Sequence, residues 1–338
     1  MKTYSHGEGD KYRLCVAPMM DWTDRHCRYF HRLLAPSALL YTEMVTTGAV
    51  LHGDRQRLLG FNQQEHPLAL QLGGSDPTDL AECARIARQW NYDEINLNVG
   101  CPSDRVQRGR FGACLMLEPL LVKNCVSSMN DAVDIPVTVK TRIGVDDCDS
   151  YDYFSDFVNT VSDSGCRVFI IHARKAWLSG LSPKENREVP ELRQDWVYQL
   201  KQERPDLTVI LNGGVLTAED ALRHAQKLDG VMLGRAAYQT PWVLAQCQRK
   251  MFDSAGVPDR ESAVIAMTQY MQEQVQLGVP VKNISRHMLG LFQGLPGARY
   301  WRRFISEQAH RAADNDQLLL QALEAKKAAI PAADRHVA

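Results

Sequence analysis

Ile95-Asn96-Leu97-Asn98-Val99-Gly100-Cys101-Pro102 is the stretch that decides the fold, because an apolar strand breaks there into a loop that carries a thiol. Short apolar runs recur along the chain at steps of roughly 20 to 40 residues, and amphipathic segments separate them. This rhythm predicts strand–helix–strand crossovers and a parallel sheet. Eight runs are present, the strand number of a (β/α)8 TIM barrel. They cover residues 14–19, 38–44, 68–72, 94–99, 137–141, 168–172, 208–211 and 231–233.

The amphipathic segments have the capping signals of helices. Asp76-Pro77 opens one helix, residues 151–162 predict a second, and Thr217 caps a third at residues 217–227. Beyond residue 253 no further strand-like run occurs. We therefore predict an α/β fold, a TIM barrel at residues 1–252 followed by a smaller all-helical domain at residues 258–338. The helices expected in that domain cover residues 260–277, 284–292, 297–308 and 315–329.

Composition bounds the class of protein. The 338 residues are 45% hydrophobic and 23% charged, with a net charge of −1, as in an ordinary globular protein. Nine cysteines without C-x-x-C spacing indicate a reducing compartment, so we expect a cytoplasmic protein. We expect no metal site, because no second Cys or His stands at ligand spacing from Cys101. We also expect no signal peptide, no membrane segment and no obligate protein partner.

One segment is strongly basic within this neutral chain. Residues 282–311 contain six Lys and Arg residues against the single acid Glu307, and Tyr300 and Trp301 stand among them. A charge run is usually a solvated helix face, but the near absence of acids favours binding to nucleic acid. The six cations are Lys282, Arg286, Arg299, Arg302, Arg303 and Arg311.

Residues suited to an anion follow several of the predicted strands. Asn212-Gly213-Gly214 and Gly234-Arg235 end the last two strands, where barrels commonly build a phosphate site. Lys140 and His172 end the fifth and sixth. Each alone has a plainer explanation, as a turn glycine, a rim salt bridge or a core side chain, but together they favour a bound anionic cofactor. The same ring includes Gln71 and Pro18-Met19-Met20, at the ends of the third and first strands.

Cys101 stands outside its apolar run, between Gly100 and Pro102, which distinguishes it from the other cysteines. A cysteine is most often a buried core residue. At the active-site face of a barrel, however, a thiol is placed for chemistry. An ordinary thiol has a pKa of ~8.5 and is mostly protonated near neutrality, so it can act as an acid. We therefore predict Cys101 as a proton donor.

These residues resemble those of the tRNA-dihydrouridine synthase family, most closely its bacterial A type. The resemblance spans nearly the whole predicted barrel in order, and the string that contains Cys101 is highly specific. Much of the family has glycine after this histidine, whereas Ala173 is similar to the A type. The matching strings are APMMDWTD (17–24), NLNVGCPS (96–103), VKTRIG (139–144), HARKAWL (172–178), LNGG (211–214) and GR (234–235).

The resemblance implies an enzyme that binds FMN, is reduced by NADPH, and converts uridines 20 and 20a of the tRNA D-loop to 5,6-dihydrouridine. It implies a hydride from flavin N5 to uracil C6, a proton from Cys101 to C5, and a hydrogen bond from Asn98 to the uracil. The residues implied to contact tRNA are Lys184, Arg187, Arg299 and Arg302. Those implied to surround FMN are Pro18, Met19, Met20, Gln71, Lys140, His172, Asn212, Gly213, Gly214, Gly234 and Arg235.

Two other classes of function remain open from the residues alone. A dihydroorotate dehydrogenase-like FMN barrel acting on a free pyrimidine would share the flavin loops, but would not need a basic helical appendage. A noncatalytic RNA-binding protein on a barrel scaffold would leave Cys101 and the glycine loops without a role. A purified protein that is yellow and bleaches with NADPH excludes the second alternative. A base inside folded RNA would have to be flipped out to reach the barrel mouth.

Overall fold

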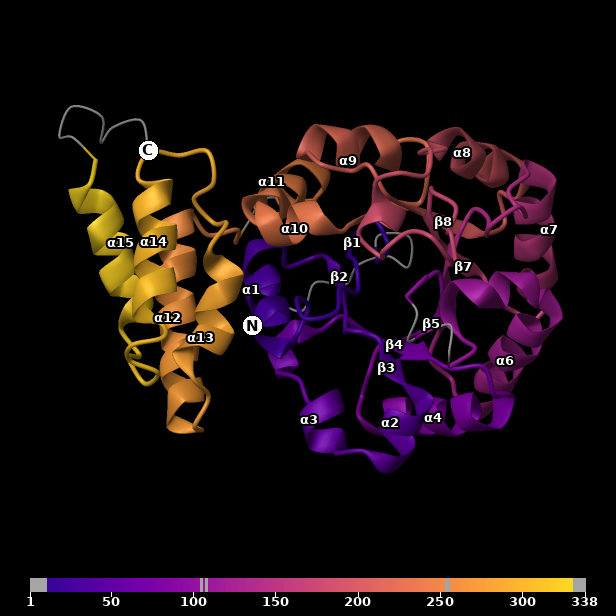
Figure 1. The fold of residues 1–338 in the computed structure, drawn as a ribbon, viewed down its shortest axis with the longest axis horizontal. Coiled ribbons are helices and arrows are strands. Elements are labelled where there is room, and N and C mark those ends of the chain that lie inside the picture. Colours follow the sequence, from indigo (N-terminus) through magenta and orange to yellow (C-terminus); the bar gives the residue numbers. More distant parts are fainter. Residues whose placement is uncertain (1–10, 104–105, 107–108, 253–255, 331–338) are drawn as a thin grey trace.

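The computed structural model describes residues 11–103, 106, 109–252 and 256–330. Within these ranges the barrel strands are β1 (Leu14–Val16), β2 (Leu39–Tyr41), β4 (Leu68–Gly73), β5 (Glu94–Val99), β6 (Val137–Arg142), β7 (Val168–His172), β8 (Thr208–Asn212) and β9 (Gly230–Leu233). All pair in parallel, in the order β1-β2-β4-β5-β6-β7-β8-β9, and β9 pairs with β1 to close the ring. Figure 1 shows the strands inside the surrounding helices. The prediction of an eight-stranded TIM barrel is confirmed.

Only the first part of the second apolar run, residues 38–44, forms a barrel strand, and a further short strand follows the run. β2 ends at Tyr41, and the two-residue strand β3 (Val45–Thr46) then pairs with the end of β4. The break falls at Thr42, whose Oγ1 accepts the backbone N–H of Gln71 at 3.1 Å and donates to the carbonyl of Glu43 at 2.7 Å. The Thr42 hydroxyl therefore accepts the N–H of Gln71 in place of a backbone carbonyl, although the N–H of Thr42 still donates to the carbonyl of Ala69. Apolar periodicity does not reveal this exchange.

Helices cover the outside of the barrel (Figure 1). Asp76 caps α4 (Pro77–Gln89), and Ser150 caps α7 (Tyr151–Ser162), which coincides with the predicted helix. No helix in the described ranges is both long and apolar enough to span a bilayer. The other elements here are α1 (Arg25–Leu34), α2 (Thr47–His52), α3 (Arg55–Leu59), η1 (Gln63–Glu65), η2 (Gly112–Leu117), α6 (Pro119–Ala132), η3 (Glu185–Arg187), α8 (Gln194–Glu203), α9 (Ala218–Ala225), α10 (Arg235–Gln239) and α11 (Trp242–Met251).

Side chains from alternate strand positions fill the inside of the barrel. Cys15, Leu39, Ala69, Ile170 and Met232 belong to a buried cluster separate from the larger core outside the ring. The larger core joins the outer faces of the strands to the surrounding helices and continues into the C-terminal helices. The barrel is therefore packed through its interior, and its open face lies at the carboxyl ends of the strands.

The C-terminal region is helical and lies on one side of the barrel, next to α1 (Figure 1). It contains α12 (Arg260–Gln276), α13 (Val281–Ser285), η4 (Arg286–Met288), α14 (Ala298–Gln308) and α15 (Leu318–Ala328). The single helix predicted at residues 284–292 is wrong. The chain turns after η4, where Gly290 approaches the carbonyl of Gln239 so closely that an added Cβ would lie 2.1 Å from it. The predicted domain limits at residues 1 and 338 lie outside the described residues.

Asp24 joins the barrel to this helical region. Its carboxylate caps α1 through the backbone N–H groups of His26 and Cys27, and it also binds Arg286 at 2.6 Å and His287 at 3.1 Å. Burial opposes ionisation of Asp24, but these partners outweigh it and hold its pKa well below the ordinary value. Nearby, the ring of Tyr29 stacks on that of Tyr270 with centroids 3.9 Å apart.

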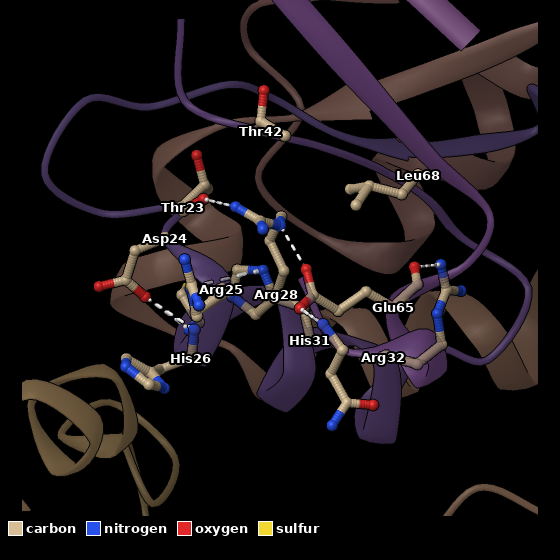
Figure 2. Close-up of polar contacts among 12 residues, drawn as sticks. Thr23, Asp24, Arg25, His26, Arg28, His31, Arg32, Thr42, Glu65 and Leu68 are labelled. Atoms are coloured by element: carbon tan, nitrogen blue, oxygen red, sulfur yellow. Dashed lines mark hydrogen bonds and ion pairs between the residues drawn. The ribbon is translucent and has the colours of Figure 1, made fainter. Parts of the chain in front are cut away.

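A buried ion pair fixes α1 against the segment that leads into β4 (Figure 2). The Nε of Arg28 lies 2.6 Å from Oε2 of Glu65, and Arg28 also donates to the carbonyl of Thr23 at 2.8 Å. The other oxygen of Glu65 accepts the N–H of Asn62 at 2.6 Å, and Arg32 donates to the carbonyl of Glu65 at 2.9 Å. Burial alone would lower the pKa of Arg28, but the carboxylate of Glu65 raises it.

Candidate active site

The carboxyl ends of the strands bring the predicted residues to one face of the barrel. Asn98 on β5 pairs in register with Lys140 on β6, and His172 on β7 pairs with Arg142 on β6 and Asn212 on β8. These strand ends are polar, whereas deeper positions of β7 and β8 belong to the apolar interior. In TIM barrels this face carries the active site.

Asn98 shapes the loop that carries Cys101. Its Oδ1 accepts the backbone N–H of Gly100 at 3.1 Å and that of Cys101 at 3.0 Å, the arrangement of an Asx turn. The Cys101 thiol is partly exposed and lies 3.6 Å from Oγ of Ser103. Six of the nine cysteines are buried, so Cys101 differs from most of them in being accessible. Cys101 is thus one of three partly exposed cysteines, and it is the one that follows β5 at the mouth of the barrel.

Positive charge gathers near the thiol. Burial, followed by the charge of Arg142, lowers the pKa of Lys140 to about 7. Burial and the same neighbouring cations lower the pKa of His172 well below its ordinary value, so its imidazole is neutral near pH 7. The charge of Arg187 also acts on Lys140, which places this predicted tRNA contact beside the predicted cofactor residues. Cations that disfavour one another's charge form a site suited to an anionic ligand.

Arg142 is a site residue that reasoning from single positions missed. Its guanidinium donates to the carbonyl of Gly100 at 3.0 Å, of Lys175 at 3.0 Å and of Asn186 at 2.8 Å. Arg142 thereby ties the loop of Cys101 to the loop after β7. The signal in the sequence was a second cation two positions after Lys140, which in a strand faces the same side.

Glycine is required after β8 and fits after β9 for different structural reasons. Gly213 has a φ of +102°, and an added Cβ would lie 2.8 Å from Cδ2 of His172. Gly214 also has a positive φ, of +77°. At Gly234 the nearest atom to an added Cβ is the Cβ of Ala17, at 4.0 Å, so there is open space beside this part of the backbone. Gly213 and Gly214 are turn glycines, while Gly234 leaves room at the mouth.

Two predicted side chains already have partners within the protein. Arg235 forms an ion pair with Glu188 and lies 3.5 Å from the carbonyl of Arg187. Asn212 donates to the carbonyl of Met232 at 2.9 Å. Arg235 would have to exchange Glu188 for a phosphate, whereas Asn212 helps to hold β8 against β9.

The loop after β1 closes the ring of predicted residues. Thr23 Oγ1 accepts the backbone N–H of Met19 at 2.9 Å, and Asp21 has a φ of +64°. Met19 packs against the barrel interior, but the side chain of Met20 is 53% exposed and is not a core residue. Trp22 stacks on Tyr238 with ring centroids 4.3 Å apart, which anchors the loop to α10.

The predicted tRNA contacts lie on two elements. Arg299 and Arg302 are exposed on α14, and Lys184 is exposed just before η3. The expectation that Trp301 belongs to this surface is wrong. Trp301 is fully buried, donates to the carbonyl of Met288 at 2.9 Å and packs on Phe292, because it faces the opposite side of α14. Arg286 and Arg303 are engaged in ion pairs with Asp24 and Glu307.

A closed parallel barrel with amides, cations and an accessible thiol at its open face defines a TIM-barrel enzyme. In the part of the chain that the structure describes, no group of three or more His, Cys, Asp or Glu residues could hold a metal ion. The dihydrouridine synthase (Dus) family matches residues 15–329. The chain belongs to this family of flavin-dependent oxidoreductases.

Relatives align with nearly the whole chain. A tRNA-dihydrouridine(20/20a) synthase of Vibrio parahaemolyticus is 60% identical over 313 residues, which cover 92% of this chain and 96% of the relative. One of Escherichia coli is 58% identical over 326 residues, 96% of this chain and 98% of the relative. One of Shewanella oneidensis is 61% identical over 297 residues, 88% of each chain.

Proposed function

We propose that the protein reduces uridines 20 and 20a of the tRNA D-loop to 5,6-dihydrouridine, with FMN as cofactor and NADPH as reductant. The observation that carries this proposal is the accessible thiol of Cys101, held by Asn98 beside the Lys140 cation. The relatives are named for the same two tRNA positions, which supports this substrate. The barrel at residues 1–252 is the proposed catalytic unit, and the helices at 258–338 are the tRNA-binding unit, working in the cytoplasm.

The residues of the mouth fit FMN. Lys140 suits the negative charge of the reduced ring, the neighbouring charges of Arg142 and Arg187 add to the positive potential of the mouth, and Gly234 leaves space beside its backbone. An FMN held by these residues would supply the hydride chemistry that links NADPH to C6 of the uracil. The proposed cofactor contacts are Pro18, Met19, Met20, Gln71, Lys140, His172, Asn212, Gly213, Gly214, Gly234 and Arg235.

Cys101 completes the reduction by giving its thiol proton to C5 of the uracil. Its loop position keeps the sulfur accessible, and the Asx turn fixes the backbone from which the thiol projects. Asn98 uses one N–H of its amide on Gln71, and the second N–H of that amide can serve the uracil. Because the barrel interior is packed, the base enters from the open face after it is flipped out of the tRNA.

The proposed function is tested on tRNA from cells that lack this protein. Incubation with the purified protein, FMN and NADPH is expected to produce dihydrouridine at positions 20 and 20a, mapped by mass spectrometry of nuclease fragments. Orotate and free uracil in parallel reactions test the rival free-pyrimidine activity. Reduction of a free pyrimidine with unchanged tRNA would contradict the proposal.

If Arg299 and Arg302 contact tRNA phosphates, removing either charge should weaken the salt dependence of tRNA binding. Arg299→Gln and Arg302→Gln are each expected to weaken tRNA binding and to reduce the slope of log K against log salt by about one. NADPH oxidation by oxygen should not change, because both residues lie on α14, outside the barrel. Arg85→Gln, on the exposed face of α4, is the matched control. An unaltered slope in both α14 variants would count against phosphate contacts by these arginines.

Lys140 predicts a pH-dependent stability in the protein freed of flavin. Its pKa is about 7 in the folded chain against an ordinary 10.5, so between these values the unfolded chain binds more protons than the folded one. The stability of the wild type should therefore rise across this window relative to Lys140→Met. Thermal unfolding midpoints of both proteins at pH 7 and pH 10 check this. Parallel pH curves would show that Lys140 keeps its proton throughout.

A further inference from the structure

The inward-facing side of β5 is polar along its whole length. Glu94, Asn96 and Asn98 alternate with the apolar residues of this strand, and all three are buried. Most other inward positions of the barrel are apolar. Burial of a polar group is unfavourable unless the group finds a hydrogen-bond partner. The partners of these three side chains therefore indicate their role.

Hydrogen bonds join the floor of the barrel to the loop of Cys101 without interruption. From the mouth downward, Asn98 Nδ2 donates to Gln71 Oε1 at 2.9 Å, and Gln71 Nε2 donates to Asn96 Oδ1 at 2.7 Å. Asn96 Nδ2 then donates to Thr138 Oγ1 at 2.9 Å, and that hydroxyl donates to Glu94 Oε1 at 2.8 Å. Every donor in this column points toward the floor.

The Glu94 carboxylate gives the column its direction. It accepts the hydroxyls of Tyr12 and Tyr41, each at 2.9 Å, and lies 3.1 Å from Nζ of Lys11. An ionised carboxylate can only accept hydrogen bonds, so the Thr138 hydroxyl must donate its hydrogen bond to Glu94 and accept one from Asn96. The oxygen of Asn96 is then left for Gln71, and the oxygen of Gln71 for Asn98.

The mouth imposes the same direction from the other end. An amide has nearly the same shape when its oxygen and nitrogen are exchanged, so its neighbours decide which way it points. The backbone N–H groups of Gly100 and Cys101 require the oxygen of Asn98 on their side. If the column reversed, the Asn98 nitrogen would meet two N–H donors, and the Cys101 loop would lose the bonds that shape it.

We propose that Glu94, Thr138 and Asn96 are positioning residues, which fix the amide orientations of Gln71 and Asn98 and thereby the placement of the Cys101 thiol. The inference rests on the proposed function, which has Gln71 and Asn98 contact FMN and uracil. None of the three touches the reactants. They act through a column that runs through the barrel from its floor to its mouth.

Thr138 offers a matched set of variants. Thr138→Val keeps the side-chain volume but removes the hydroxyl, whereas Thr138→Ser keeps the hydroxyl. Thr141→Val makes the same chemical change on the same strand, at a buried residue outside the column. Glu94→Gln provides an independent variant, because its amide can donate to Thr138 and so frees the column to reverse.

Two measurements on the purified holoenzyme and on its flavin-free form test the proposal. One is the dissociation constant of FMN from flavin fluorescence. The other is the rate of iodoacetamide alkylation at Cys101, measured by peptide mass spectrometry with the partly exposed Cys148 of the same digest as reference. Thr138→Val is expected to weaken FMN binding and to change the alkylation rate at Cys101, each by about three- to tenfold, the effect of one hydrogen bond.

Thr138→Ser and Thr141→Val should stay within about twofold of the wild type in both measurements. If Thr138→Val behaves like Thr141→Val, the proposal is overturned. Should Thr138→Val fail to fold, Glu94→Gln decides in the same way, with a changed rate at Cys101 for the proposal and an unchanged rate against it. A protein that binds no FMN would refute the proposed function, while the alkylation comparison would still test the column.

Discussion

Replacing Cys101 with alanine is expected to lower turnover on tRNA by about 10²- to 10⁴-fold, the contribution of a positioned acid to a proton-transfer step. The substitution removes the proposed proton donor but none of the proposed flavin contacts. FMN should therefore remain bound and should still be reduced by NADPH at the rate of the wild type. Single-turnover formation of dihydrouridine, followed by mass spectrometry, separates the two steps.

Cys148→Ala is the control for the loss of a partly exposed thiol. Cys148 lies in a turn between β6 and α7, where its backbone bonds to Val145, and the proposed reaction does not use it. Wild-type turnover is expected in this variant. If Cys101→Ala also keeps wild-type turnover, another group must protonate C5 and the acid role of Cys101 is refuted.

The second large effect is expected on stability, at the buried ion pair between Arg28 and Glu65 (Figure 2). Glu65→Gln should lower the free energy of unfolding by about 3–5 kcal/mol, the cost of leaving one buried charge without its partner. The new amide keeps the volume of the side chain but turns an N–H toward either the Arg28 guanidinium or the backbone N–H of Asn62. Urea denaturation of the variant and the wild type measures the difference.

Glu82→Gln makes the same chemical change at an exposed ion pair. Glu82 lies 3.0 Å from Arg85 on α4, and both side chains are about half exposed. Loss of this pair should cost less than about 1 kcal/mol, because water solvates the remaining charge. Equal effects of the two substitutions would mean that Arg28 finds another partner or reaches solvent when Glu65 is neutralised.

Periodicity and capping signals predicted the elements well where they act within a short segment. The residues 151–162 form α7, and Asp76 and Thr217 cap α4 and α9, because the cap and the helix that it starts are neighbours in the sequence. The eight apolar runs predicted the barrel for the same reason.

Predictions were wrong where a distant segment decides the local structure. The run at 38–44 breaks because Thr42 bonds to Gln71, and the helix expected at 284–292 ends early because Gly290 meets the backbone of Gln239. Trp301 looked like part of a basic surface, but it fills the core of the helical region. Thr42 and Gly290 meet partners 29 and 51 residues away, and Trp301 packs on residues outside its own helix, so the local pattern carries no record of these contacts.

The sequence by itself determined the barrel, the strand end on which Asn98 and Cys101 stand, and the family resemblance carried by that string. Only the tertiary structure decided that Arg142 ties two loops together and that Glu94 orients amides at the far end of the barrel. The physical reason is that side-chain periodicity is a property of one segment, whereas hydrogen-bond direction and shared charge depend on which strands are neighbours in the closed ring.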